Sequence, residues 1–161
     1  MKLFLKRDTS ADNISFMIYD NMGLPKYSVS AEIGNWMKMV VFSGEGEQRS
    51  VIRYNKLMLD YFTILCQKRF YVLIPNIKNG FAFTIYGSTY KFNGKPGDDF
   101  YMSAPDGTVV MTHKRCRSSG MSGFEITIND EAHEMFLLSA AICADMYLDV
   151  SEKQKAVPLP T

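Results

Sequence analysis

Cysteine and histidine are scarce in this chain of 161 residues, which contains three cysteines and two histidines. Cys66, Cys116 and Cys143 are odd in number and far apart in sequence, so we expect neither a disulfide framework nor a four-ligand zinc site. The first residues, MKLFLKRD, lack the long apolar core of a secretory signal. We therefore expect a reducing, cytoplasmic compartment.

An excess of charge of one sign is also missing, because the formal net charge is only +1. Binding to nucleic acid usually requires a broad basic face, and its electrostatic signature is a strongly positive domain. We therefore expect no nucleic-acid partner. Any electrostatic binding must come from a local patch of charge.

The motifs of common enzymes are missing too. His113 and Cys116 are three apart, so on a strand they point to opposite faces and cannot share a metal ion. His133 is expected to be a packing residue at the start of a helix. Residues 44–46, GEG, lack the third glycine of a dinucleotide fingerprint, and residues 120–123, GMSG, lack the spacing of a nucleophile elbow. We expect no catalytic residue, no metal and no cofactor, and hence no enzyme activity.

Long hydrophobic runs are limited to one, EMFLLSAAICADMYLDV, in which residues 135–144 are apolar except for Ser139. As a helix, Glu134–Val150 spans roughly 25 Å. A transmembrane helix needs about twenty predominantly apolar residues, whereas this stretch also carries Asp145 and Asp149. We therefore predict no transmembrane segment. A helix that is apolar on all sides is a buried helix.

The acidic residues of this predicted helix lie on one side of it, near its two ends. Glu131, Glu134, Asp145 and Asp149 fall within about 60° of one another on a helical wheel, and we expect these ends to reach solvent. Two alternatives stay open for Asp145 and Asp149: one of them pairs with Lys, Arg or backbone N–H groups, or both face water. The predicted core side chains of the helix are Met135, Phe136, Leu138, Ile142 and Met146.

Most of the remaining sequence alternates between apolar and polar residues, as in the runs 26–33 and 123–129. This period of two is typical of half-buried antiparallel strands. The pairs Asn79-Gly80, Asn93-Gly94 and Asp106-Gly107 are strong hairpin signals. We predict a mainly β (α+β) protein with about ten to twelve strands, either a sandwich or, because closure removes exposed edges, a closed antiparallel barrel. The barrel, with the helix of about residues 130–150 in its lumen, would form one domain over 1–151, followed by a flexible tail, 152–161.

Three stretches resemble the LURP-one-related group of the tubby-like superfamily, which also includes the phospholipid scramblases. They are FMIYDNMGLPKYSV, FTIYGSTYKFNGKPGDDFYMSAPDGTVVMTHKR and GFEITINDEAHEMFLLSAAICADMYLDV. The resemblance implies a barrel of twelve strands around a central hydrophobic helix. It also implies recognition of phosphoinositide head groups through basic residues, although no lipid-binding position can be carried over residue by residue. Scramblase activity is not carried over, because the proline-rich and cysteine-rich segments of scramblases are missing.

Two short basic stretches are candidates for an anion site. The first is His113-Lys114-Arg115-Cys116-Arg117, in which His113, Arg115 and Arg117 would share one face of a strand and Lys114 would point away. The second and smaller one is Lys68-Arg69. Arginine forks match the geometry of phosphate, so one interpretation is a site for anionic head groups; the other is a solvated strand end.

Two functional hypotheses follow. The first is a non-enzymatic module that binds anionic phospholipid, such as phosphoinositide, peripherally at a basic surface patch. The alternative is a protein-interaction or structural module, which an exposed apolar patch would favour.

Overall fold

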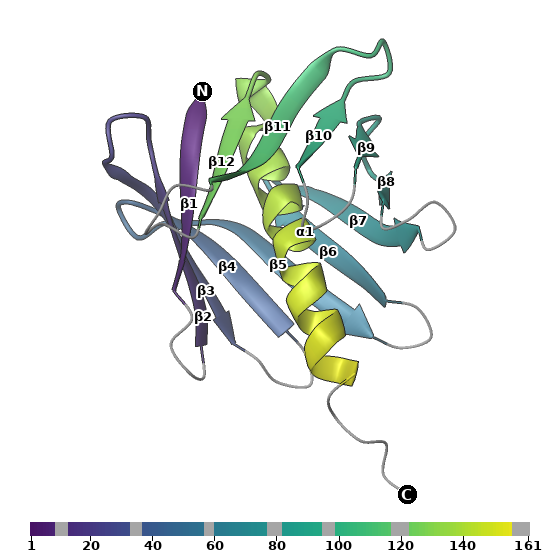
Figure 1. Ribbon diagram of the computed structural model, residues 1–161, viewed down its shortest axis with the longest axis horizontal. Coiled ribbons are helices and arrows are strands. Elements are labelled where there is room, and N and C mark those ends of the chain that lie inside the picture. The colour runs from purple at the N-terminus through teal and green to yellow at the C-terminus, as the bar shows by residue number, and fades with distance from the viewer. Residues whose placement is uncertain are drawn as a thin grey trace, which may run out of the picture.

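The computed structural model describes residues 1–8, 13–32, 37–56, 60–76, 82–94, 99–116 and 123–155. Within these residues the chain forms twelve strands and one long helix, which follows a short 3-10 helix (Figure 1). The elements are β1 (Lys2–Asp8), β2 (Asn13–Tyr19), β3 (Pro25–Glu32), β4 (Met37–Ser43), β5 (Gln48–Lys56), β6 (Asp60–Cys66), β7 (Arg69–Asn76), β8 (Ala82–Tyr86), β9 (Lys91–Asn93), β10 (Phe100–Ser103), β11 (Val109–Cys116), β12 (Gly123–Ile128), η2 (Glu131–His133) and α1 (Glu134–Lys155).

The twelve strands form one antiparallel sheet that nearly closes into a barrel. Its order is β8-β7-β6-β5-β4-β3-β2-β1-β12-β11-β10-β9. Except for β8 and β9, strands that are consecutive along the chain pair in the sheet, and β1 also pairs with β12, with Leu3 opposite Ile126. The seam lies between β8 and β9, at the two ends of this order. This architecture confirms the predicted antiparallel barrel and excludes the sandwich.

Alternating burial along the strands explains why the sheet closes around a core. In β6, Phe62, Ile64 and Cys66 are buried, whereas Leu65 between them is exposed. The inward side chains meet α1, which runs through the barrel from the top of the view (Figure 1). The apolar residues of the alternating sequence pattern therefore lie on the inner face of the barrel wall, and the residues between them lie on its outer face.

The two ends of the barrel differ in the elements that they carry. The chain passes from β12 into α1 at one end, which we call the upper end. Because the sheet is antiparallel and sequential, the turns at 20–24, 44–47, 67–68, 87–90 and 104–108 also lie at the upper end. We call the other end, toward which β11 and α1 run, the lower end. Any site must be placed at one end or on the outer wall.

The helix confirms the prediction of a central core. Every side chain from Met135 to Tyr147 is buried, including all five predicted core residues. Phe136 stacks on Tyr71 of β7 with ring centroids 4.0 Å apart. The helix ends at Lys155, later than predicted, so it includes the first residues of the segment predicted as a tail, while 156–161 lie outside the described residues. Among the helices that the structure describes, none is both long and apolar enough to cross a membrane.

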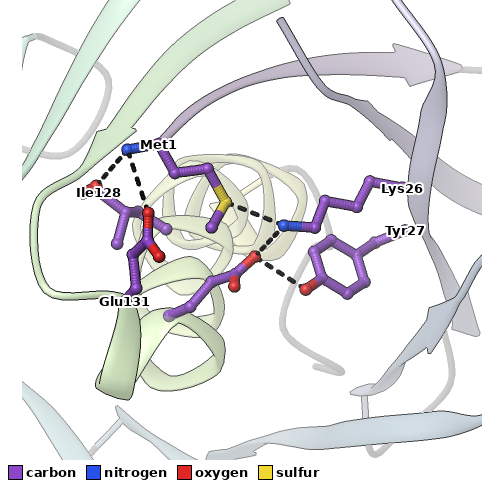
Figure 2. A network of polar contacts seen from close by, with 6 residues as sticks. Met1, Lys26, Tyr27, Ile128 and Glu131 are labelled. Carbon is purple, nitrogen blue, oxygen red and sulfur yellow. Dashed lines mark hydrogen bonds and ion pairs between the residues drawn. The ribbon is translucent and has the colours of Figure 1, made fainter.

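Polar contacts hold the upper half of the helix against the wall. Oε1 of Glu134 accepts hydrogen bonds of 2.8 Å from Nζ of Lys26 and from the hydroxyl of Tyr27 (Figure 2). Burial, followed by the Glu134 contact, raises the pKa of Tyr27. One turn further on, the hydroxyl of Ser139 is 2.8 Å from that of Ser50 on β5. The polar residue that interrupts the apolar run therefore has a partner inside the core.

The prediction that the acidic ends of the helix reach solvent is wrong for Asp145, which is buried. The barrel wall extends past this position, and Nε2 of His113 lies 3.1 and 3.2 Å from the two carboxylate oxygens. The predicted Lys or Arg partner is thus replaced by a histidine from β11. The side chain of Asp149 lies outside the described residues.

Replacing Leu138 with Asp tests the central position of the helix. A charge at this fully buried site has no partner, and we expect the free energy of unfolding to fall by at least about 3 kcal/mol. Thermal unfolding followed by circular dichroism should then show no cooperative transition, or one at much lower temperature. The control, Leu138→Met, conserves volume and should cost less than about 1.5 kcal/mol. A Leu138→Asp variant that melts like the parent would contradict the architecture.

Candidate anion-binding site

The structure places the two predicted basic stretches at opposite ends of the barrel. Lys114 and Arg115 lie near the lower end of β11, whereas Lys68 and Arg69 lie at the β6–β7 turn of the upper end. All four side chains are exposed. Arg117 lies outside the described residues. The six predicted residues therefore do not form one site.

His113 is not a surface residue, so its predicted place in an anion-binding face is wrong. Its exposed fraction is 0%. The ring stacks between Phe100 and Phe124, with centroids 4.2 and 4.6 Å away. His113 lies on the inward face of β11, where it is opposite buried Ile126. The sequence alternation placed His113 on a face of the strand but could not show that this face is the inner one.

Arg115 has a structural environment of its own. Its guanidinium carbon lies 5.8 Å from the centre of the Phe124 ring. Burial raises the pKa of Asp145, while the His113 contact and the charges of Arg115 and Arg7 oppose this rise. Arg115 is therefore close enough to the buried carboxyl group to compensate part of its charge. These contacts favour the interpretation of this stretch as a solvated strand end over that of an anion-binding site. They also indicate that Arg115 interacts with Phe124 and with the buried Asp145.

Arg69 of the smaller basic stretch borders a pocket of about 400 Å³ at the upper end. Arg69 comes from the start of β7, and Ser88, Thr89 and Tyr90 come from the turn between β8 and β9. His133, from η2, completes the wall next to α1. Besides the backbone of Gly87, the pocket is lined by Arg69, Tyr71, Ser88, Thr89, Tyr90 and His133. One cation, two aliphatic hydroxyls and an imidazole thus face one small volume.

A backbone contact explains how the β8–β9 turn approaches β7. Gly87 has φ of +93°, and a Cβ atom there would lie 2.6 Å from the carbonyl oxygen of Phe70. Any side chain would push the turn away from β7, so only glycine brings Ser88 and Thr89 beside Arg69. The sequence Gly-Ser-Thr-Tyr at 87–90 is a turn signal with two hydroxyl side chains. None of these residues was among the predicted site residues.

Tyr90 and His133, which line the pocket on the side of the helix, form a polar cluster with Asp130. The hydroxyl of Tyr90 donates a short hydrogen bond to Oδ2 of Asp130. Nδ1 of His133 is 3.1 Å from the same oxygen and 3.0 Å from the Tyr90 hydroxyl. Burial and then Asp130 raise the pKa of Tyr90 to about 12, and the bonds from Tyr90 and His133 lower the pKa of Asp130. At neutral pH, Tyr90 therefore keeps its proton and can donate it in a hydrogen bond, and Asp130 stays ionised and accepts.

The β6–β7 turn that carries the cations has an unusual backbone. Gln67 and Lys68 have φ of +50° and +60°, values for which hairpins normally use Asn and Gly. Each non-glycine residue in this region costs about 1 kcal/mol. The turn therefore places a lysine at the tip of the hairpin, where glycine or asparagine would be more stable.

Three large apolar side chains lie on the outer wall beside this turn. Leu65, Phe70 and Tyr86 are 50%, 59% and 56% exposed. Leu65 is directly opposite Phe70 in the sheet. Tyr86 is opposite Val72, two residues from Phe70 on the same face. We call these three side chains the β6–β8 patch; they lie next to Lys68 and Arg69.

An apolar groove of about 620 Å³ lies on another part of the wall, along β1. It is bordered by Phe4, Tyr19 and Phe124, and by Met22 in the β2–β3 turn. Met22 is 75% exposed. Its lining contains few charged groups, so it differs in chemistry from the pocket at the upper end.

Comparison of the chain with protein-family models, with curated proteins and with solved structures gave no match in any of the three. In the described ranges, no three His, Cys, Asp or Glu side chains are grouped closely enough to hold a metal ion.

Replacing Asp145 with Asn tests the buried pair. The raised pKa of Asp145 means that the folded protein binds more protons than the unfolded chain at pH values between the two pKa values. Stability must then fall as pH rises above about 4. Asn cannot ionise, so the parent should lose stability relative to Asp145→Asn by at most about 1.4 kcal/mol per pH unit. Urea unfolding over a series of pH values measures this difference. A parent that gains stability relative to the variant as pH rises would show that the histidine contact outweighs burial.

Proposed function

We propose that this protein is a non-enzymatic, cytoplasmic module that docks peripherally on membranes containing anionic phospholipid. The upper end of the barrel would contact the lipid, with Lys68 and Arg69 near the phosphates. The observation that carries the proposal is that Lys68 and Arg69 lie between Leu65 and Phe70 of the β6–β8 patch in the hairpin, while Arg69 also borders a polar pocket.

The physical argument joins two contributions, each weak alone. A Lys or Arg near an anionic membrane surface contributes about 1 kcal/mol, and salt screens this attraction. Apolar side chains beside the cations can enter the boundary between head groups and acyl chains, as on other interfacial elements. At about 25 cal/mol per Å², partial burial of Phe70 and its two neighbours adds a contribution that salt does not weaken. The two together support reversible docking.

The resemblance noted in the sequence supports the same proposal. A barrel of twelve strands with one C-terminal helix inside it is consistent with the fold of tubby-like and LURP-one-related proteins. Recognition of phosphoinositide head groups by tubby proteins is the behaviour we extend to this chain. Scramblase activity is not part of the proposal.

The double variant Lys68→Glu/Arg69→Glu tests the membrane contact. Loss of two cations worth about 1 kcal/mol each lowers binding by about 30-fold, before the added repulsion is counted. Co-sedimentation with phosphatidylcholine vesicles, with and without phosphatidylserine or a phosphoinositide, measures it at low and physiological salt. The parent should bind only the anionic vesicles, and more weakly at higher salt.

The matched control is Lys38→Glu/Lys114→Glu. It changes net charge by the same amount, both lysines are exposed, and both lie toward the lower end of the barrel. This variant should bind anionic vesicles nearly as well as the parent. Equal losses in the two double variants would mean that net charge, and not the upper end, determines binding. Absence of binding by the parent under all conditions would exclude lipid docking.

A tryptophan at position 70 tests insertion of the β6–β8 patch. Phe70→Trp should shift its fluorescence to shorter wavelength with anionic vesicles, because the indole enters a less polar environment. The control is Tyr101→Trp, at an exposed position of β10. Both are made with Trp36, the single tryptophan of the chain, replaced by Phe. A shift of the same size at both positions, or at neither, would contradict insertion through this patch.

A second candidate function is protein interaction through the groove along β1. The exposed Met22 beside Phe4 and Phe124 favours it, since exposed apolar surface marks many interaction sites. A Met22→Ser variant that keeps full vesicle binding would separate this groove from the lipid-docking surface.

A further inference from the structure

We propose that the pocket at the upper end binds a phosphate monoester, with Arg69 as its permanent cation and His133 as a donor that engages when its ring is protonated. The inference deepens the proposed function and rests on it for the source of the phosphate, a lipid head group. It adds a defined class of ligand and dependence on pH.

The donors fit a phosphate group in number and kind. The Arg69 guanidinium provides a planar fork that matches two phosphate oxygens. The hydroxyls of Ser88 and Thr89 line the same pocket and can donate to the others. A phosphate monoester presents three terminal oxygens, whereas a diester presents two. A pocket with several donors around one small volume therefore favours the monoester.

The polar cluster on the helix side determines which nitrogen of His133 is available. Nδ1 lies within hydrogen-bonding distance of Asp130 and Tyr90. Tyr90 already donates its proton to Asp130, so the Asp130 carboxylate is the acceptor for a proton on Nδ1 as well. Within the residues that the structure describes, Nε2 has no hydrogen-bond partner, and the ring lines the pocket. Nε2 is therefore the atom left for a ligand.

Protonation changes what Nε2 can do. In the neutral ring with its proton on Nδ1, Nε2 carries a lone pair that repels a phosphate oxygen. In the imidazolium form, Nε2 donates a charge-assisted hydrogen bond. Arg69 alone offers one positive charge, and protonated His133 provides the second that a dianion requires. Ligand binding and proton uptake are thus linked at this residue.

The charged groups around His133 are consistent with this switch. Arg69 faces it from β7, and Tyr90 and Asp130 contact it from the two loops beside it. Glu131 on the same short helix is exposed, with one carboxylate oxygen 3.9 Å from the terminal ammonium group of Met1. Glu134, the next acidic residue, bonds to Lys26 and Tyr27. Tyr71, the remaining titratable group of the pocket wall, stacks on Phe136.

Titration of the full chain with soluble anions, followed by NMR of backbone amides, tests the pocket directly. Sulfate, the anion of a strong acid, keeps its two charges over the whole pH range of the experiment, so its pH profile reports the protein alone. Inorganic phosphate is the second probe. We expect saturable shifts at residues 88–90 and 133, and affinity for sulfate that rises at least about tenfold as the pH is lowered from about 8 to about 5.

Two variants separate the roles. Arg69→Gln keeps an exposed polar side chain but removes the cation, and should abolish saturable binding at every pH. His133→Asn keeps an N–H donor for Asp130 in the place of Nδ1 but has no counterpart of Nε2. It should retain the weak binding seen at high pH and lose the rise at low pH. Saturable binding that is unchanged in Arg69→Gln, or a pH profile unchanged in His133→Asn, would overturn the assignment.

Vesicles identify the source of the phosphate. Phosphatidic acid has a monoester head group and phosphatidylglycerol a diester, and they are compared at matched surface potential. Preference for phosphatidic acid, lost in Arg69→Gln, supports the lipid source. Soluble binding without vesicle binding keeps the pocket and rejects the proposed membrane function. Vesicle binding without soluble binding, and without preference between the two lipids, keeps membrane docking and overturns the pocket.

Discussion

The space inside a twelve-stranded barrel is the constraint on which this structure depends. About eight strands enclose a lumen that their own side chains can fill, and larger barrels leave room for something else. Here that room is taken by α1, whose side chains from Met135 to Tyr147 are all buried. The helix must be apolar on every side because the wall surrounds it. A ligand must then bind at an end of the barrel or on the outer wall.

Three polar contacts locate the helix inside this apolar lumen. Glu134 bonds to β3 at the start of α1, Ser139 to Ser50 of β5 one turn later, and Asp145 to His113 of β11 further along. Buried polar pairs contribute little net stability, but breaking one leaves an uncompensated group. The hydrophobic effect is not directional, whereas a hydrogen bond requires a particular distance and orientation of its partners. We infer that these pairs specify one depth and one rotation of the helix.

The architecture could be predicted from the sequence because it depends on patterns among residues that are close together in the chain. Alternation gave the strands, and the apolar run, too short and too acidic for a membrane, gave the core helix. The sequence pattern could not show which face of β11 is the inner one. His113 is polar, and only the folded barrel places its ring between those of Phe100 and Phe124. The pocket was missed for a similar reason. Arg69, the 88–90 turn and His133 are far apart in sequence. The pairing of β7 with β8 brings Arg69 and the turn together, and the position of the helix inside the barrel adds His133.

The pocket lies where the chain leaves the barrel wall and enters the lumen. Asp130 and His133 belong to the short connection between β12 and α1, and their positions are determined by the packing of the helix below them. Arg69 and the 88–90 turn belong to strands that pack on the same helix through Tyr71 and Phe136. The wall and the helix thus contribute one side of the pocket each. The packing of the wall on the helix therefore fixes the positions of the pocket residues, because these residues lie on the same elements that form the core.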